Sequence, residues 1–230
     1  MARIRGWQRW LIVGVAVVAV LAVAGPYVYI HFVEGKAPKR LSLSSNSGPA
    51  TTSGSGAAAG VPLDGAWTVS TGSQAGYRVS EILFGQNHEA VGRTSAVTGG
   101  ATIQGNTVTA ANVTVDLTQV SSDQSRRDSQ FQHRIMDTST YPTATFKLTQ
   151  PINLASTSGK VSTKATGDLT THGVTKSVVA ELQAERSGST IRVSGSIPVI
   201  FADWSIPNPS FGPISTDDHG LIEFLLVLGH

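Results

Sequence analysis

The chain has 230 residues, of which 40% are hydrophobic, and it contains 24 glycines, 10 prolines and no cysteine. This length suits one medium-sized domain with additional segments, and the lack of cysteine excludes disulfides, cysteine nucleophiles and cysteine-based metal sites. The net charge is +2, but six of the 17 basic residues and only one of the 15 acidic residues precede residue 61. The rest of the chain is net negative, which argues against a nucleic-acid-binding surface there.

The first 33 residues have the pattern of a membrane segment. Residues 11–25 contain no charged side chain, two tryptophans precede them, and two tyrosines follow them. Aromatic residues at both ends fit the two membrane interfaces, and the stretch 10–33 is long enough to cross a bilayer. We therefore predict a cytoplasmic tail at 1–9 and a single membrane anchor at 10–33. The three arginines of the tail stay in the cytoplasm, so the rest of the chain lies outside.

A cleaved signal peptide is the alternative interpretation of this segment. The apolar core up to Ala24 is short, and residues 22–24 have the small-x-small form of a cleavage site. Against cleavage, Pro26 follows almost at once and residues 27–33 remain hydrophobic. Both interpretations place the domain outside the cytoplasm.

Residues 34–62 consist largely of Ser, Gly, Thr, Ala and Pro after a basic start. A segment with so little to bury predicts a flexible linker that holds the domain off the membrane. A glycosylated stalk is the alternative, with only the Ser/Thr content to support it.

Strand patterns recur from residue 63 to the end. The predicted strands cover 66–70, 77–84, 90–103, 111–118, 144–149, 160–170, 174–186, 191–201 and 221–228. The dipeptides Gly105-Asn106 and His172-Gly173 predict hairpin turns, and Gly99-Gly100 predicts a bulge or bend within 90–103. The proline-containing segment 203–218 predicts an irregular loop. About eight short strands with hairpin links predict an antiparallel sheet that closes into a barrel, sealed by the apolar run 221–228.

One stretch of this region also predicts a helix. Strands with alternating apolar and polar residues begin and end the stretch 111–148. Between them, Ser121 and Ser122 are candidate helix caps and Asp123 suits a helix N-terminus. Tyr141-Pro142 then returns the chain to extended geometry. The sequence predicts a short amphipathic helix, with Phe131 and Ile135 capping the barrel.

The inward positions of the predicted strands mix aliphatic residues with Gly and Ala. A solid core normally has bulky residues at most sites, so this mixture predicts an elongated apolar cavity. The alternative is that the small residues only ease strand crossing or twist.

The sequence has no recognisable catalytic, cofactor-binding or metal-binding pattern. No histidine pair has HxxxH spacing, no GxSxG elbow is present, and no glycine loop stands between a strand and a helix. We therefore expect no enzyme activity, no cofactor and no metal, and His172 is expected to be solvated or to stabilise its turn. For Arg126, Arg127 and Asp128, we favour an Arg–Asp pair that locks the helix to the barrel rim. The alternative is an arginine that meets a phosphate or other polar head group at the tunnel mouth.

Three segments in order resemble the YceI-like family, also called the polyisoprenoid-binding or lipid-binding family. They are SSDQSRRD at 121–128, Tyr141-Pro142-x-Ala144-x-Phe146, and GDLTTHGVT at 167–175. The resemblance covers about residues 64–229, and the preceding anchor and linker resemble membrane-tethered actinobacterial members.

The resemblance implies an all-β, extended eight-stranded antiparallel, lipocalin-like barrel for residues 63–230. It also implies a tunnel that holds a long isoprenoid or other amphiphilic chain, with the helix-bearing loop 121–140 beside the opening. The family has no well-defined catalytic residues, so only a tunnel lining is carried over. The predicted lining comprises Val113, Val115, Leu117, Phe131, Ile135, Phe146, Leu148, Leu169, Leu182, Ile197 and Val199.

Two hypotheses about function follow. The first is a membrane-tethered protein outside the cytoplasm that carries or sequesters an isoprenoid, a quinone or another lipid. The second is a ligand-free interaction module whose barrel is filled by its own side chains and whose partners bind outer loops such as 203–218. The volume of the internal cavity separates the two, and an enzyme that acts on a lipid has little motif support.

Overall fold

The computed structural model describes residues 37–44, 62–83, 85–154, 159–212 and 214–230, together with scattered residues between Trp7 and Gly25. Most of the predicted anchor, 10–33, and most of the predicted linker, 34–62, therefore lie outside the described residues. Within the described part of the chain, no helix is both long and apolar enough to cross a membrane.

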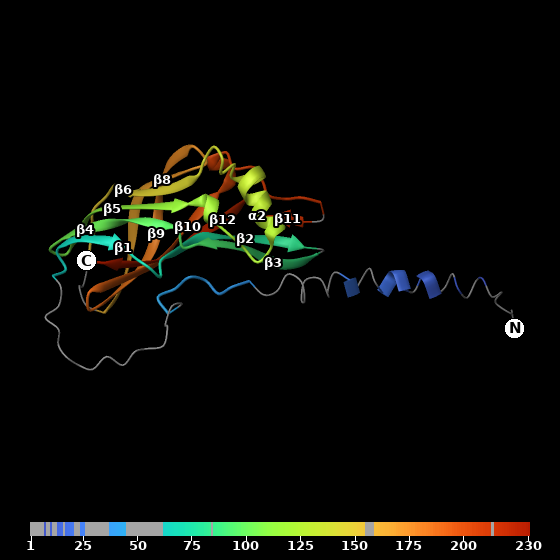
Figure 1. The fold of residues 1–230 in the computed structure, drawn as a ribbon, viewed down its shortest axis with the longest axis horizontal. Helices are drawn as coiled ribbons and strands as arrows, with labels where there is room; N and C mark the ends of the chain where they lie inside the picture. Colours follow the sequence, from blue (N-terminus) through green and yellow to red (C-terminus); the bar gives the residue numbers. More distant parts are fainter. Residues whose placement is uncertain are drawn as a thin grey trace.

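The described residues after 62 form one antiparallel sheet of twelve strands (Figure 1). The strands are β1 (Gly65–Val69), β2 (Gln74–Leu83), β3 (Gln86–Thr94), β4 (Val97–Gln104), β5 (Thr107–Asp116), β6 (Thr143–Leu148), β7 (Ile152–Asn153), β8 (Lys160–Thr171), β9 (Val174–Ser187), β10 (Thr190–Ile200), β11 (Ile214–Thr216) and β12 (His219–Gly229). Eight of them follow one another in the order β1-β4-β5-β6-β8-β9-β10-β12. Because β12 also pairs with β1, this path closes on itself. The prediction of an eight-stranded antiparallel barrel sealed by the last strand is confirmed.

Three of the remaining strands extend the barrel wall at the end where α2 (Ser125–Gln130) lies. β2 pairs with β12, while β3 and β11 flank β2. The short β7 pairs with β5. Both predicted hairpin turns are present, between β4 and β5 and between β8 and β9. His172 and Gly173 have φ angles of 49° and 75°, the left-handed geometry that a two-residue hairpin requires.

Three details of the strand prediction are wrong. The predicted strand 90–103 is two strands, β3 and β4, which separate at Ser95 and Ala96. Gly99 and Gly100 do not form a bulge but lie within β4, where a Cβ would stand 2.1 Å and 2.2 Å from carbonyl oxygens of the flanking strands. The register shift lies after Thr102 instead. The predicted loop 203–218 also contains β11.

The predicted helix is present but begins later than expected. It consists of α2 (Ser125–Gln130), which continues directly into the π-turn η3 (Phe131–Ile135). Ser121 does not cap it, because the backbone of Ser121 pairs with that of Arg93 in β3. The N-cap residue is Gln124, which makes no side-chain capping hydrogen bond. Two 3-10 turns, η2 (Leu117–Gln119) and η4 (Phe201–Trp204), complete the described helical elements after residue 62.

Three aromatic side chains that face the barrel interior each lie against a glycine of a neighbouring strand. The pairs are Tyr77 on Gly92, Phe146 on Gly167, and Phe224 on Gly195. A Cβ on each of these glycines would lie 2.4 to 2.7 Å from the ring, closer than carbon atoms approach without strain. The glycines thus give the rings room beside the wall, so the small inward residues do more than ease strand crossing.

The outer wall carries a network of charged side chains on β2, β3 and β12, and two of them are buried. The side chains of Arg78 and Glu223 are 3% and 4% exposed, and Arg78 Nε lies 3.2 Å from Glu223 Oε2. Arg78 Nη1 also donates to Glu89 Oε2 at 2.7 Å, and Arg93 Nη2 donates to Glu223 Oε1 at 2.6 Å. Each charge therefore has an oppositely charged partner, which buried charges require.

Residues 37–44, which we call the strap, cover this network. The carbonyl oxygens of Pro38 and Lys39 accept hydrogen bonds from the two arginines of the network, at 2.7 Å and 2.5 Å. Leu41 and Leu43 are buried against Leu225, whose exposure is 0%. This part of the predicted flexible linker thus packs against the barrel.

We predict that Gly195→Ala destabilises the barrel. Its Cβ would lie 2.4 Å from the carbonyl oxygen of Glu181 and 2.7 Å from Phe224 Cζ, an overpacking that costs about 1–3 kcal/mol. Gly229→Ala on β12 is the matched control, because its Cβ would meet no atom within 4 Å. Urea denaturation measures both free energies of unfolding, and equal values would contradict the packing described.

We also predict that Glu223→Gln lowers the free energy of unfolding by about 3–5 kcal/mol, because it leaves Arg78 buried with its charge only partly compensated. The control is Glu181→Gln, whose pair with Lys164 spans 3.8 Å between side chains that are 75% and 70% exposed. Exposed pairs contribute less than about 1 kcal/mol. Denaturation curves that shift equally for the two variants would show that the network does not stabilise the fold.

Candidate functional site

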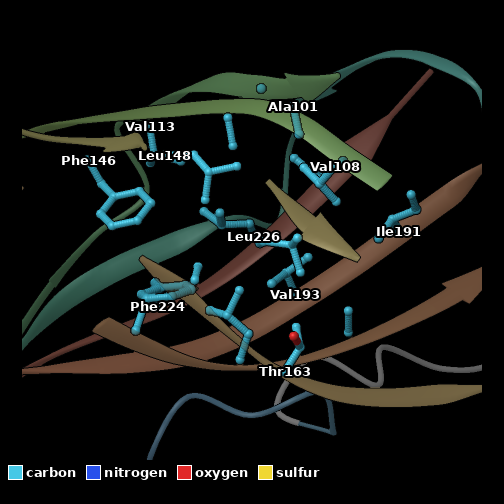
Figure 2. Close-up of a pocket in the computed structure, with 18 of the residues that line it drawn as sticks. Ala101, Val108, Val113, Phe146, Leu148, Thr163, Ile191, Val193, Phe224 and Leu226 are labelled. Carbon is cyan, nitrogen blue, oxygen red and sulfur yellow. The ribbon is translucent and has the colours of Figure 1, made fainter. Parts of the chain in front are cut away.

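The first of two cavities inside the barrel has an almost entirely apolar wall. Its volume is ≈ 200 Å³, and its lining comes from both sides of the barrel. Figure 2 shows Phe146, Val193 and Phe224 among the side chains that point into this shared space, with Thr163 contributing an oxygen. The lining continues to Gly159 and Val161, at the end of the barrel where β8 begins.

The second cavity lies at the opposite end of the barrel, which we call the α2 end. Its volume is ≈ 250 Å³. The elements that border it are α2, η3 and the segment 206–216, together with the inner faces of β2 and β12. Its lining is apolar in the barrel and polar beside α2, where Glu81, Arg126 and Arg127 contribute.

The two cavities adjoin in the middle of the barrel. Four residues border both of them, namely Ala75, Val115, Ala144 and Ile222. Two of these are alanines, so little side-chain volume separates the two spaces. Together the cavities fall within the usual size of small-molecule sites, about 300–1,000 Å³.

All eleven residues predicted to line a tunnel border these cavities. Val113, Val115, Phe146, Leu148, Leu169, Leu182 and Ile197 border the first, and Val115, Leu117, Phe131, Ile135 and Val199 border the second. Their contact with a ligand stays a prediction. The alternation of apolar and polar residues along β5, β6 and β8–β10 was the signal that located most of them.

The sequence analysis missed the lining residues of β2 and β12, including Tyr77, Ile222 and Phe224. β12 shows no alternation because its outward residue Leu225 is as apolar as its inward ones and is buried under the strap. In β2 the pattern is blurred by the outward Arg78, which is buried, and the inward Glu81, which is charged.

A group of charged side chains borders the second cavity beside α2. Glu81 is 9% exposed, and its Oε1 lies 3.0 Å from His88 Nδ1 and 3.5 Å from Arg127 Nη2. Arg127 also forms an ion pair with Asp123 one turn earlier in the same loop. Arg127 thus connects the helix to the barrel wall through β2.

The contacts at the rim include other partners than the expected pair of an arginine with Asp128, whose role stays a prediction. Asp128 accepts hydrogen bonds from the backbone N–H and the hydroxyl of Ser122, at 2.7 Å and 2.6 Å, and so fixes the chain that enters α2. The acidic residue of the barrel that pairs with Arg127 is Glu81. Arg126 is exposed, and its guanidinium lies 5.7 Å from the centre of the Phe211 ring.

Tyr77 packs against the π-turn η3 inside the barrel. Its ring stacks on that of Phe131, with 5.0 Å between centroids and 13° between planes. Burial raises the pKa of the Tyr77 phenol well above its usual value, although the nearby Arg127 charge opposes the shift. Tyr77 therefore stays neutral in the range where proteins function, as a group inside an apolar cavity must.

The described residues show no cluster of three or more His, Cys, Asp or Glu side chains that is arranged to hold a metal ion. The His172 side chain contacts residues outside its turn: its Nδ1 lies 3.2 Å from the carbonyl oxygen of Trp204, and its ring packs on Tyr141.

Comparison with solved structures supports the architecture. A polyisoprenoid-binding domain from Saccharophagus degradans, described as implicated in plant cell wall breakdown, superposes with a TM-score of 0.57 at 20% identity, covering 71% of this chain and 97% of that one. BcnA of Burkholderia cenocepacia gives a TM-score of 0.50 at 21% identity, covering 66% and 95% of the two chains. At these identities the likeness concerns the fold.

Comparison at the level of sequence identifies the family. No protein with a curated description matches the chain. The family model of the YceI-like domain matches residues 67–228, from β1 to β12. Since this match covers the whole barrel and most of the chain, the protein belongs to the YceI-like family.

Proposed function

We propose that the barrel binds one long apolar molecule, an isoprenoid, a quinone or another lipid, along its two adjoining cavities. The observation that carries the proposal is the apolar lining that runs past Ala144 from one end of the barrel to the other. The similar domain from Saccharophagus degradans, which is described as polyisoprenoid-binding, adds support. The proposed role of the barrel is binding, without a catalytic step.

Burial of hydrocarbon drives binding. Each CH₂ group removed from water contributes roughly 0.8 kcal/mol, so a long chain gains ample free energy with few polar contacts. Selectivity then depends on the length and shape of the cavities. A polar head group fits the α2 end, where charged side chains border the second cavity.

The proposal also places the protein in the cell membrane, with a single span at 10–33, a cytoplasmic N-terminus and the barrel outside the cytoplasm. The hydrophobic pattern of residues 10–33 and the arginines that precede it support this placement. There the barrel carries or sequesters its ligand.

The decisive experiment is organic extraction of the purified barrel followed by mass spectrometry. We expect one class of long apolar molecule at close to one copy per chain. A barrel that is empty in every preparation, including after incubation with isoprenoid alcohols, quinones and phospholipids, would favour the ligand-free interaction module.

We predict that Ala144→Phe abolishes lipid retention. The new ring would stand where the two cavities adjoin and divide them. Lys147→Phe is the matched control, because it adds the same ring to the same strand at an exposed position. The amount of extracted lipid per chain measures the effect, and melting curves verify that both variants fold. Unchanged retention in Ala144→Phe would contradict a ligand that passes this point.

We predict that Arg127→Ala acts mainly on stability. Its removal leaves Glu81 buried without the opposing guanidinium, at a cost of about 1–3 kcal/mol. The control is Arg126→Ala at an exposed neighbouring position. Its free energy of unfolding is expected to differ from that of the parent by less than about 0.5 kcal/mol. Thermal denaturation and lipid retention are measured together. Lost retention in Arg127→Ala with an unchanged melting temperature would assign Arg127 to a ligand head group instead.

A further inference from the structure

The direction of the strap fixes the side from which the chain reaches the barrel. The carbonyl of Pro38 meets Arg78, which pairs in register with Leu221 near the start of β12. Further along, Leu41 and Leu43 pack on Leu225. The strap therefore runs in the same direction as β12, away from the α2 end, as its light-blue trace in Figure 1 shows. Its first residue, Ala37, is the one nearest the α2 end.

The chain between the strap and the predicted membrane span is short. Only residues 34–36 separate Ala37 from Val33, the predicted end of the span. An extended chain covers at most about 3.3–3.6 Å per residue, so Val33 lies within about 14 Å of Ala37 whatever path these residues take. The Ser/Gly-rich residues 45–61 cannot lengthen this distance, because the chain on both sides of them, at Leu43 and at Trp67, is held on the barrel.

The α2 end also exposes apolar side chains. Ile82, Ile200 and Phe211 are about half exposed and lie on the last part of β2, the end of β10 and the segment beside α2. Among the described residues of the barrel, Val179 is the other exposed large aliphatic or aromatic residue. The guanidinium groups of Arg126 and Arg134 lie 5.7 Å and 5.8 Å from the Phe211 ring. Aromatic and basic residues side by side are typical of surfaces that contact the bilayer interface.

We propose that the strap holds the barrel directly on the bilayer, with the α2 end facing the membrane. The second cavity then opens toward the lipid phase, and a long apolar ligand passes between bilayer and barrel without crossing water. The proposal rests on the proposed function, because it requires the membrane span at 10–33. It replaces the flexible tether predicted from composition with a fixed attachment.

The test uses the full-length chain in phosphatidylcholine vesicles with and without dibrominated phosphatidylcholine. Because the chain has no cysteine, single labels can be placed by Ile82→Cys at the α2 end and by Lys160→Cys at the opposite end, both exposed positions. We expect the brominated lipid to quench most of the emission of a dye at 82 and little of that at 160. A strap variant, Leu41→Ser with Leu43→Ser, is expected to remove this difference while the melting curve still shows a folded barrel.

Equal quenching at the two positions, or stronger quenching at 160, in the chain with an intact strap would overturn the proposed orientation. If the full-length chain does not sediment with the vesicles, both the proposed orientation and the membrane span at 10–33 are overturned. Lipid retention by the barrel is measured separately by extraction, so a barrel that retains lipid but shows no orientation contradicts this inference and leaves the proposed function standing.

Discussion

The structure depends on closing a β-sheet into a ring without filling the ring. β12 meets β1, so every strand of the ring has two neighbours. The interior would normally be packed solid, yet the rings of Tyr77, Phe146 and Phe224 lie on glycines of adjacent strands, and two cavities remain. An empty cavity costs roughly 24 cal/mol per Å³, so volumes of ≈ 200 and ≈ 250 Å³ would cost about 5 and about 6 kcal/mol if left unfilled. A ligand that fills them offsets this cost, and binding and stability are then coupled.

The outer wall of the barrel carries the charge network on which the strap packs. Arg78 and Glu223 are buried, and the strap contacts this network through the carbonyl oxygens of Pro38 and Lys39. Charges buried with good partners specify one arrangement more than they stabilise it, since removing either partner is costly. The network thus defines where the strap lies, and through the strap it defines where the preceding chain meets the barrel.

The sequence predicted the closed barrel. It also predicted the lining residues on strands that have one face exposed to solvent. In β5, β6 and β8–β10, alternation alone located residues such as Val113, Phe146 and Ile197 at the cavities. It failed where the outer face is also buried, as at Leu225, because composition then no longer distinguishes inside from outside. The prediction of Ser121 as a helix cap was wrong because its backbone pairs with that of Arg93. Local sequence preferences do not reveal a contact between residues so far apart in the chain. The same holds for the strap, whose leucines are separated from Leu225 by most of the chain.

The central claim is that one thread-like ligand occupies both cavities. The most direct test is a crystal structure of the protein purified from the cells that produce it, without delipidation. The account predicts continuous density that runs from the cavity beside Phe146 past Ala144 to the cavity beside Phe131. Cavities closed by repacked side chains, or density confined to one of the two, would contradict it.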